Sequence, residues 1–203
     1  MKIMMTLGAL LVCSLSFGQQ DGNYIVIINS DSVQINLDTA YQYKTSSGED
    51  LVIKVVQPNV LTYTDSMISF QYDKSLSVSD TEIGEGIEQC MVISASGNGF
   101  LVQKYKTIDP SSLTQLMLNE ITKQNVSYGY VKTEKKFKKK LLSGQTIEGI
   151  EATLTYKGEK EVYTVATYGG RDEGIIVVTM LLIEDTKAKQ IIDLFLNTLK
   201  IKE

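Results

Sequence analysis

A run of lysines is the one strongly charged feature of this sequence. Residues 132–140 read KTEKKFKKK, and five lysines make up its basic half: Lys135, Lys136, Lys138, Lys139 and Lys140. Such a run could bind phospholipid headgroups, an anionic polysaccharide or an acidic partner protein. The same lysines also suit an exposed edge strand or hairpin, where their charge prevents edge-to-edge pairing with another sheet. We favour the edge-strand interpretation and keep the five lysines as a candidate interaction patch.

Acidic residues gather in a second stretch, next to two glycines: Asp80, Glu82, Glu85 and Glu88. A calcium site needs several oxygen ligands that converge in one loop, and this spacing does not match the EF-hand pattern. Acid–base chemistry of the glycosidase kind would require two of these carboxylates to face each other across a cleft. We therefore expect a solvated acidic loop and predict no metal-binding residues.

The absence of histidine limits the chemistry most. Without His, the chain lacks Ser-His-Asp and Cys-His nucleophilic sites, the commonest general base and the main ligand of most zinc and copper sites. Cys90 lies in an apolar run, which predicts a small buried side chain rather than a reactive thiol. Gly97 and Gly99 mark a turn and lack the Lys-Ser/Thr of a phosphate loop. The sequence predicts no catalytic residue, no cofactor and no enzyme activity.

The N-terminus has the pattern of a secretory signal peptide. Lys2 precedes an apolar stretch that is too short for a transmembrane anchor, and small residues favour cleavage after Gly18. A lipid anchor at Cys13 is disfavoured, because bacterial lipoprotein signals place a small residue before that cysteine and Val12 stands here. We expect export of a bacterial protein to the periplasm or the extracellular space, with no transmembrane segment once residues 1–18 are removed.

Composition and patterning divide the rest of the chain into two parts. Residues 19–58 alternate short strands with turns and predict an N-terminal β-hairpin elaboration. Residues 59–203 have the size of one α+β domain. The formal net charge of −4 disfavours binding to the phosphates of nucleic acid.

The order of elements in the larger part favours an antiparallel sheet covered by helices, an α+β fold. Hairpins dominate, and a helix over 109–124 interrupts them, with Asp109 as its cap and Pro110 in its first turn. A buried strand over 174–183 then leads into an amphipathic helix over 187–199.

Several short motifs from residue 67 onward resemble the PsbP-like family. They are ISFQYD at 68–73, FLV at 100–102, DPSSL at 109–113, GIEA at 149–152 and NTLKI at 197–201. That fold is shared by the photosystem II extrinsic protein PsbP, Mog-type Ran-binding proteins and secreted bacterial proteins of unknown role. The Pro-x-x-Trp usual after the first strand is absent here, and residues 19–58 lie outside the resemblance. It implies an α/β/α sandwich with no shared catalytic residues and a binding or assembly role.

We therefore expect an exported, non-catalytic protein that binds a partner protein or a cell-envelope component. The alternative is a small-molecule or lipid carrier with a pocket between the sheet and the helices. Candidate lining residues for that pocket are Met117, Leu118, Ile121, Phe195 and Leu196. Core packing would explain the same side chains.

Overall fold

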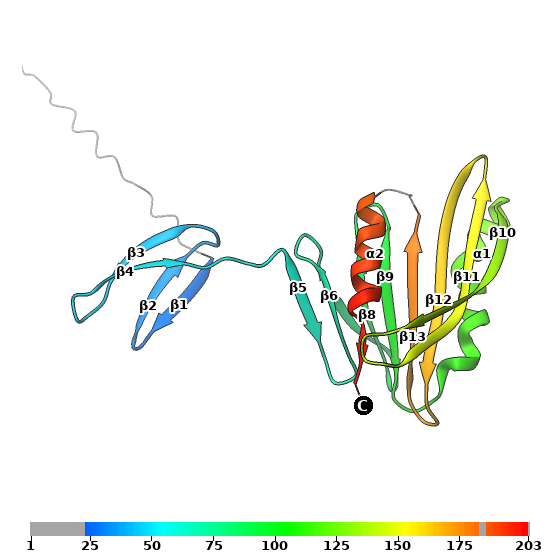
Figure 1. Cartoon of the computed structure of the whole chain (residues 1–203), viewed down its shortest axis with the longest axis horizontal. Coiled ribbons are helices and arrows are strands. Elements are labelled where there is room, and N and C mark those ends of the chain that lie inside the picture. The colour runs from blue at the N-terminus through cyan, green and yellow to red at the C-terminus, as the bar shows by residue number, and fades with distance from the viewer. Residues whose placement is uncertain (1–22, 183–185, 203) are drawn as a thin grey trace, which may run out of the picture. The chain divides into compact units, whose positions relative to one another are not determined.

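The computed structural model describes residues 23–182 and 186–202 (Figure 1). The predicted signal peptide, residues 1–18, lies outside the described residues. The described chain forms two compact units that divide between Gln57 and Pro58. Within the described ranges, no helix is long and apolar enough to cross a membrane.

The N-terminal unit consists of two antiparallel hairpins. β1 (Tyr24–Ile28) pairs with β2 (Asp31–Ile35), and β3 (Ala40–Lys44) pairs with β4 (Asp50–Lys54). Asn29 has a φ of 55° in the short turn between β1 and β2, a conformation that Asn tolerates better than most residues. The Tyr43 hydroxyl donates a hydrogen bond to Asp31 at 2.7 Å and so ties the second hairpin to the first.

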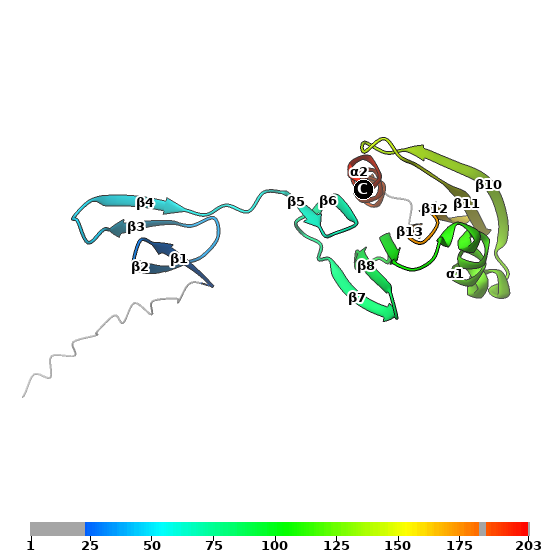
Figure 2. The same ribbon diagram turned by 90° about the horizontal axis from the view of Figure 1, so that it is seen from below.

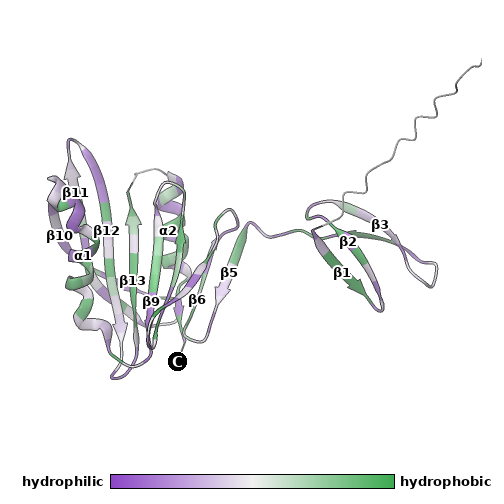
Figure 3. Cartoon of the chain, turned by 180° about the vertical axis from the view of Figure 1, so that it is seen from behind, coloured by the Kyte–Doolittle hydropathy of each residue, from purple (hydrophilic) through white to green (hydrophobic). Residues whose placement is uncertain are grey.

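Large apolar side chains remain at the surface of this unit. Ile25 and Ile27 are 64% and 74% exposed, and Figure 3 colours β1 as hydrophobic. They stand two residues apart on one strand, so both project from the same face of it. A unit this small can bury only a small core, which leaves such side chains in water.

Residues 58–202 are organised around a seven-stranded antiparallel sheet (Figure 1). Its strand order is β10-β11-β12-β13-β9-β8-β7, so two meanders, β7 to β9 and β10 to β13, join through the β9–β13 pair. The strands are β7 (Ser79–Gly84), β8 (Ile87–Ile93), β9 (Gly99–Tyr105), β10 (Val131–Lys140), β11 (Thr146–Tyr156), β12 (Glu159–Gly169) and β13 (Gly174–Leu181).

A small sheet and the helices complete this unit. The small sheet has the order β14-β6-β5 and contains β5 (Val60–Thr64), β6 (Ile68–Asp73) and β14 (Lys200–Ile201). The helices are η1, a 3-10 turn (Pro110–Leu113), α1 (Thr114–Tyr128) and α2 (Thr186–Thr198). Figure 2 shows α1 and α2 on opposite sides of the large sheet. The predicted α+β class, an antiparallel sheet with helices packed on it, is confirmed.

Asp109 begins the first helical segment as the sequence predicts. Its carboxylate accepts a hydrogen bond from the backbone N–H of Ser111 at 2.9 Å, and Pro110 occupies the first turn. The segment starts as the 3-10 turn and continues as α1 beyond its predicted end. Gly129 ends it with a φ of 114°, the left-handed conformation that glycine adopts without steric cost.

The side chains of β13 alternate between two hydrophobic cores, one on each face of the large sheet. Ile175 and Val177 pack with α2 and the small sheet, whereas Ile176 and Val178 pack on the α1 side. None of the four is more than 1% exposed. The prediction of a strand covered on both faces is therefore confirmed for β13.

One segment differs from its predicted structure. The acidic stretch that we expected as a loop forms β7, which pairs with β8 and has an irregular register between Glu82 and Gly84. Pairing with the neighbouring strand outweighs the poor strand propensity of its residues.

Candidate functional site

The lysine run lies on β10, at one edge of the large sheet. β10 pairs with β11 along all ten of its residues, and no other described strand covers its outer edge. Phe137 packs against the core on the α2 side, which fixes the orientation of its neighbours by strand alternation. The lysines divide accordingly: Lys135 and Lys139 lie on the α2 side, and Lys136, Lys138 and Lys140 on the α1 side. The predicted edge strand is confirmed.

Acidic residues of β11 hold two of the five lysines. Lys135 pairs with Glu151 at 2.8 Å, and Lys138 pairs with Glu148 at 2.5 Å. Both lysine side chains are about 70% exposed. Exposed ion pairs contribute about 0–1 kcal/mol, so an outside anion can compete for these lysines.

The other three lysines differ in their contacts. Lys139 donates a hydrogen bond to the side-chain oxygen of Asn197 at 2.8 Å and so connects β10 to α2. In the part of the chain that the structure describes, Lys136 and Lys140 have no acidic side chain at ion-pair distance. These two charges are available to a partner.

A cleft lies between α2 and strands β10 to β13, on the face of the sheet that α2 covers. Its volume is about 460 Å³, within the range of small-molecule pockets, roughly 300–1,000 Å³. β10 and β11 line one side, α2 lines the other, and β12 and β13 lie between them. The cleft therefore borders the lysine run.

Two threonines lie side by side on the sheet, and both side chains line this cleft. Thr164 on β12 and Thr179 on β13 are directly opposite in the antiparallel register, and both line the cleft. They are 5% and 4% exposed, and neither hydroxyl has a hydrogen-bond partner among the described residues. Neither hydroxyl oxygen is among the buried atoms without a partner, so both are accessible from the cleft and can hydrogen-bond to a bound molecule.

Apolar side chains flank the threonines. Val162 and Leu181 continue the same two strands, and Ile192 and Leu196 line the cleft from α2. The cleft thus offers hydroxyl groups on the sheet, apolar side chains beside them and charged residues from β10, β11 and α2.

The structure brings one of the five predicted lining residues to this cleft. Leu196 lines it, whereas Phe195 is fully buried in the core beneath α2. Met117, Leu118 and Ile121 belong to the core on the opposite face of the sheet, with α1. The sequence identified the amphipathic helices, but it did not show which side of each helix faces open space.

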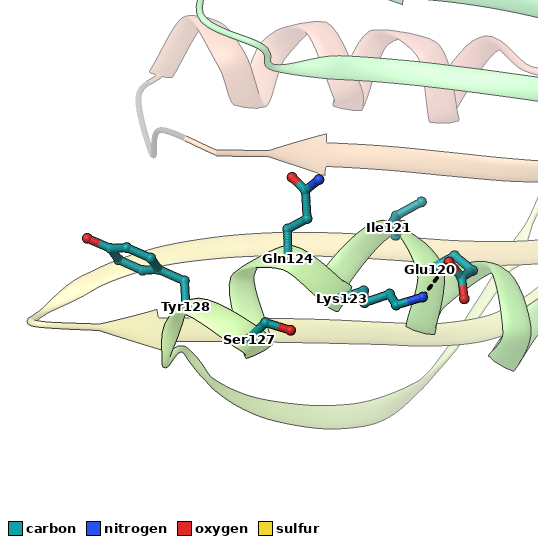
Figure 4. A pocket seen from close by; sticks show the side chains of 6 residues that line it. All are labelled: Glu120, Ile121, Lys123, Gln124, Ser127 and Tyr128. Carbon is teal, nitrogen blue, oxygen red and sulfur yellow. Dashed lines mark ion pairs between the residues drawn. The ribbon is translucent and has the colours of Figure 1, made fainter.

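A second hollow runs along the surface of α1 (Figure 4). Its volume of about 880 Å³ exceeds that of the cleft, but all six lining residues belong to this one helix. Lys123 and Glu120, which line it, form an exposed ion pair at 3.5 Å. A hollow without an opposing wall cannot enclose a ligand, so the cleft beside α2 is the better candidate site.

The α2-side core also contains a buried charge. Lys104 on β9 is 1% exposed, and its ammonium nitrogen lies 2.6 Å from Asp65, 3.3 Å from Glu88 and 3.5 Å from Asp80. The Tyr63 hydroxyl donates to Asp65 at 2.9 Å and also contacts the Asp80 carboxylate. Three carboxylates and one phenol therefore surround a single buried ammonium group.

The pKa values of Lys104, Asp65 and Tyr63 are all shifted away from neutral pH. Burial alone would lower the pKa of Lys104, but the hydrogen bond to Asp65 and the nearby carboxylates raise it. Burial alone would raise the pKa of Asp65, but hydrogen bonds from Lys104 and two backbone N–H groups lower it. Burial, together with the bonds to Asp80 and Asp65, raises the pKa of Tyr63. A general acid or base works best with a pKa near the working pH, so this network suits a structural role.

Cys90 is a buried thiol, as the sequence predicts. Burial raises its pKa to about 12; Lys104 opposes this shift, and the nearby Asp80 and Asp65 add to it. Because the thiolate is the reactive form, this side chain is a poor nucleophile at neutral pH.

The acidic cluster remains largely exposed to solvent, but two of its four residues also pair with the buried Lys104, which the sequence did not predict. Asp80 and Glu88 contact Lys104, whereas Glu82 and Glu85 are exposed. Glu88 stands opposite Lys104 in the β8–β9 register, which puts both side chains on the same face. A signal existed in the sequence, because a lysine within an apolar strand requires a counter-ion. Across the described ranges, no three acidic or cysteine side chains are grouped to hold a metal ion.

The fold and the site define a mostly β, α+β protein with a lysine-bearing edge strand and an open cleft beside α2. No protein-family model and no curated protein matches the sequence. Among solved structures, the chain is similar to a crystal structure from Bacteroides thetaiotaomicron VPI-5482, with 10% sequence identity and a TM-score of 0.40. The match covers 73% of this chain and 50% of that one, so this chain spans about half the length of that protein. A likeness this distant assigns neither a ligand nor an activity.

Proposed function

We propose that this is an exported, non-catalytic protein that binds an acidic partner protein or an anionic cell-envelope component along β10. The observation that carries the proposal is the position of the lysine run, on a ten-residue strand at the edge of the sheet. Lys136 and Lys140 project from this strand without an acidic partner in the described part of the chain. A partner can pair with the open backbone edge and place anionic groups beside these two ammonium groups.

The same lysines disfavour a second copy of this chain at that edge. Two β10 strands side by side would bring like charges together, and like charges on neighbouring strands are destabilising. The positive charge of β10 thus favours an acidic partner, because it repels a second basic strand.

We further propose that the fold is PsbP-like, that residues 1–18 direct export, and that residues 19–58 form an elaboration of the domain at 59–203. Helices on both faces of an antiparallel sheet support the α/β/α arrangement that the resemblance implies. The PsbP-like family has no shared catalytic residues, which agrees with a binding role.

Reversing both unpaired charges, Lys136→Glu with Lys140→Glu, should weaken partner binding at least about tenfold. Each basic residue near an anionic surface contributes about 1 kcal/mol, and reversal adds repulsion. The partner is recovered by cross-linking and affinity capture from envelope fractions of the producing bacterium and then titrated against both proteins. The matched control, Lys123→Glu with Lys160→Glu, makes the same charge change on α1 and β12 and should bind like the wild type. Equal losses in the two double variants, or none in either, would exclude β10 as the site.

A second candidate function, carriage of a small molecule or lipid, is favoured by the cleft. Its volume and its two unpartnered threonine hydroxyls are those of a ligand site. If the protein is a carrier, a native mass spectrum after purification without detergent should show a retained ligand. A bare mass, unchanged after incubation with a lipid extract, counts against carriage.

A further inference from the structure

The cleft has the features of a built binding site rather than of loose packing. Thr164 and Thr179 are more than nine-tenths buried, lie opposite each other and face the same space. Valine has the same branched shape and would fill these positions without a polar atom. These two adjacent hydroxyls lack partners among the described residues and are accessible from the cleft, so one bound polar group can accept hydrogen bonds from both.

The surroundings of the hydroxyls add an apolar contact. Val162 and Leu181 lie on the same strands as the threonines, and Ile192 and Leu196 contribute from α2. A ligand that fits both surfaces has an apolar body and a compact hydrogen-bonding head. An amphiphile meets this description, because its apolar chain can lie against these four side chains while its head reaches the hydroxyls.

The charged side chains that line the cleft favour a negative head. Glu151 already pairs with Lys135, and the side chain of Lys138 lies on the α1 side, where it pairs with Glu148. Of the remaining charged side chains that line the cleft, Lys139 and Lys189 outnumber Asp193. The cleft therefore has one positive charge in excess, which a single carboxylate would neutralise.

We propose that the cleft binds a single-chain monocarboxylate amphiphile of the medium-chain fatty-acid type, an inference that rests on the carrier function proposed above. The ligand carboxylate accepts hydrogen bonds from the hydroxyls of Thr164 and Thr179. Its alkyl chain lies between the apolar side chains of α2 and those of β12 and β13. Hydrogen bonds to a charged group in a partly dry site are stronger than neutral ones, so the head fixes the orientation of the ligand.

Isothermal titration calorimetry with decanoate tests this proposal on the exported chain. The double variant Thr164→Val with Thr179→Val should bind decanoate at least about tenfold more weakly, because it removes both donors and keeps their shape. Its unfolding midpoint should stay close to that of the wild type, because neither hydroxyl has a hydrogen bond within the described residues to lose. Weaker binding without lost stability is not expected of side chains that serve packing alone.

Thr167→Val is the matched control. Thr167 lies on the same strand, β12, but its hydroxyl contacts the backbone carbonyl of Glu148 and the hydroxyl of Thr114, on the α1 side. This variant should bind decanoate like the wild type.

Two further probes test whether the site binds a free carboxylate, an uncharged alcohol or a phospholipid membrane. Decanol should bind the wild type at least about tenfold more weakly than decanoate, because it lacks the charge that the lysines favour. Vesicles of anionic phospholipid should not displace decanoate, because the cleft takes a monomer. Binding to vesicles but not to decanoate would place the interaction at a membrane surface and overturn the proposal.

Equal decanoate affinity in wild type and double variant, or no binding by either, also overturns the proposal. The carrier function itself would survive if the native mass spectrum showed a retained ligand of another class. The β10 proposal has its own charge-reversal test, so its outcome does not depend on the cleft.

Discussion

Replacing Lys104 with methionine should lower the free energy of unfolding by about 3 kcal/mol. Methionine preserves the length of the side chain but leaves Asp65 without its buried cation, beside two further carboxylates. Removing one partner of a buried ion pair typically costs about 3–5 kcal/mol. The lower end applies because Asp80 and Glu88 are 47% and 36% exposed and can regain water. Denaturant unfolding at pH 7 measures the difference.

Acid should reduce this difference between wild type and Lys104→Met. In the folded wild type the pKa of Asp65 lies below its ordinary value, against about 3.9 in the unfolded chain. Its carboxylate therefore stabilises the fold fully above about pH 4, and this contribution is lost as the pH falls through the folded pKa. In the variant the cation that lowers this pKa is gone, and burial favours the protonated form. A difference that stayed constant from about pH 7 to pH 3 would contradict the role of Asp65 as the charge partner.

Lys106→Met provides the control two residues further along the chain, just after the end of β9. Lys106 also pairs with Glu88, but its side chain is 46% exposed. Exposed pairs contribute about 0–1 kcal/mol, so this variant should unfold close to the wild type. Similar losses in both variants would show that burial of Lys104 is not what makes its pairing important.

The sequence predicts most clearly the elements whose pattern is local. β13 is a continuous apolar stretch, and α2 repeats apolar residues every three or four positions. In both, the local pattern predicts which side chains are buried. Asp109 and Pro110 likewise mark a helix start within two residues. β7 was missed because its residues are polar and its structure comes from the pairing with β8. The PsbP-like resemblance stays a prediction.

The candidate sites depend on contacts that no local pattern records. Asp65 and Lys104 are 39 residues apart in the chain and meet because the small sheet packs on β9. Thr164 and Thr179 lie in strands rich in β-branched residues, where threonine is common for its shape alone. Nothing in the sequence distinguishes a threonine that faces a cleft from one that packs. The lysine run was visible because charge density can be read directly, although its division between two faces required the register.

The second large effect should arise at Phe195, which is fully buried beneath α2. Its ring stacks on Phe100 with centroids 3.7 Å apart and meets the edge of Phe70 at 5.3 Å. Phe195→Ala should lower the free energy of unfolding by about 4 kcal/mol, because a Phe-to-Ala change in a core costs about 3–5 kcal/mol. Denaturant unfolding measures this loss. Hydrogen exchange should also show faster opening of the α2 amides, since this ring anchors the helix to the sheet.

Leu196→Ala, at the next residue, separates the anchoring of α2 from the lining of the cleft. Leu196 is only half-buried and lines the cleft, so its truncation should cost about 1 kcal/mol of stability. It should nevertheless weaken decanoate binding, because it removes part of the apolar wall while α2 stays in place. Phe195→Ala should reduce binding only to the extent that α2 detaches, and the loss should therefore grow with denaturant. If instead Leu196→Ala destabilised the fold as much as Phe195→Ala and left ligand affinity unchanged, α2 would be held from its cleft side, and this face would belong to the core rather than to a binding site.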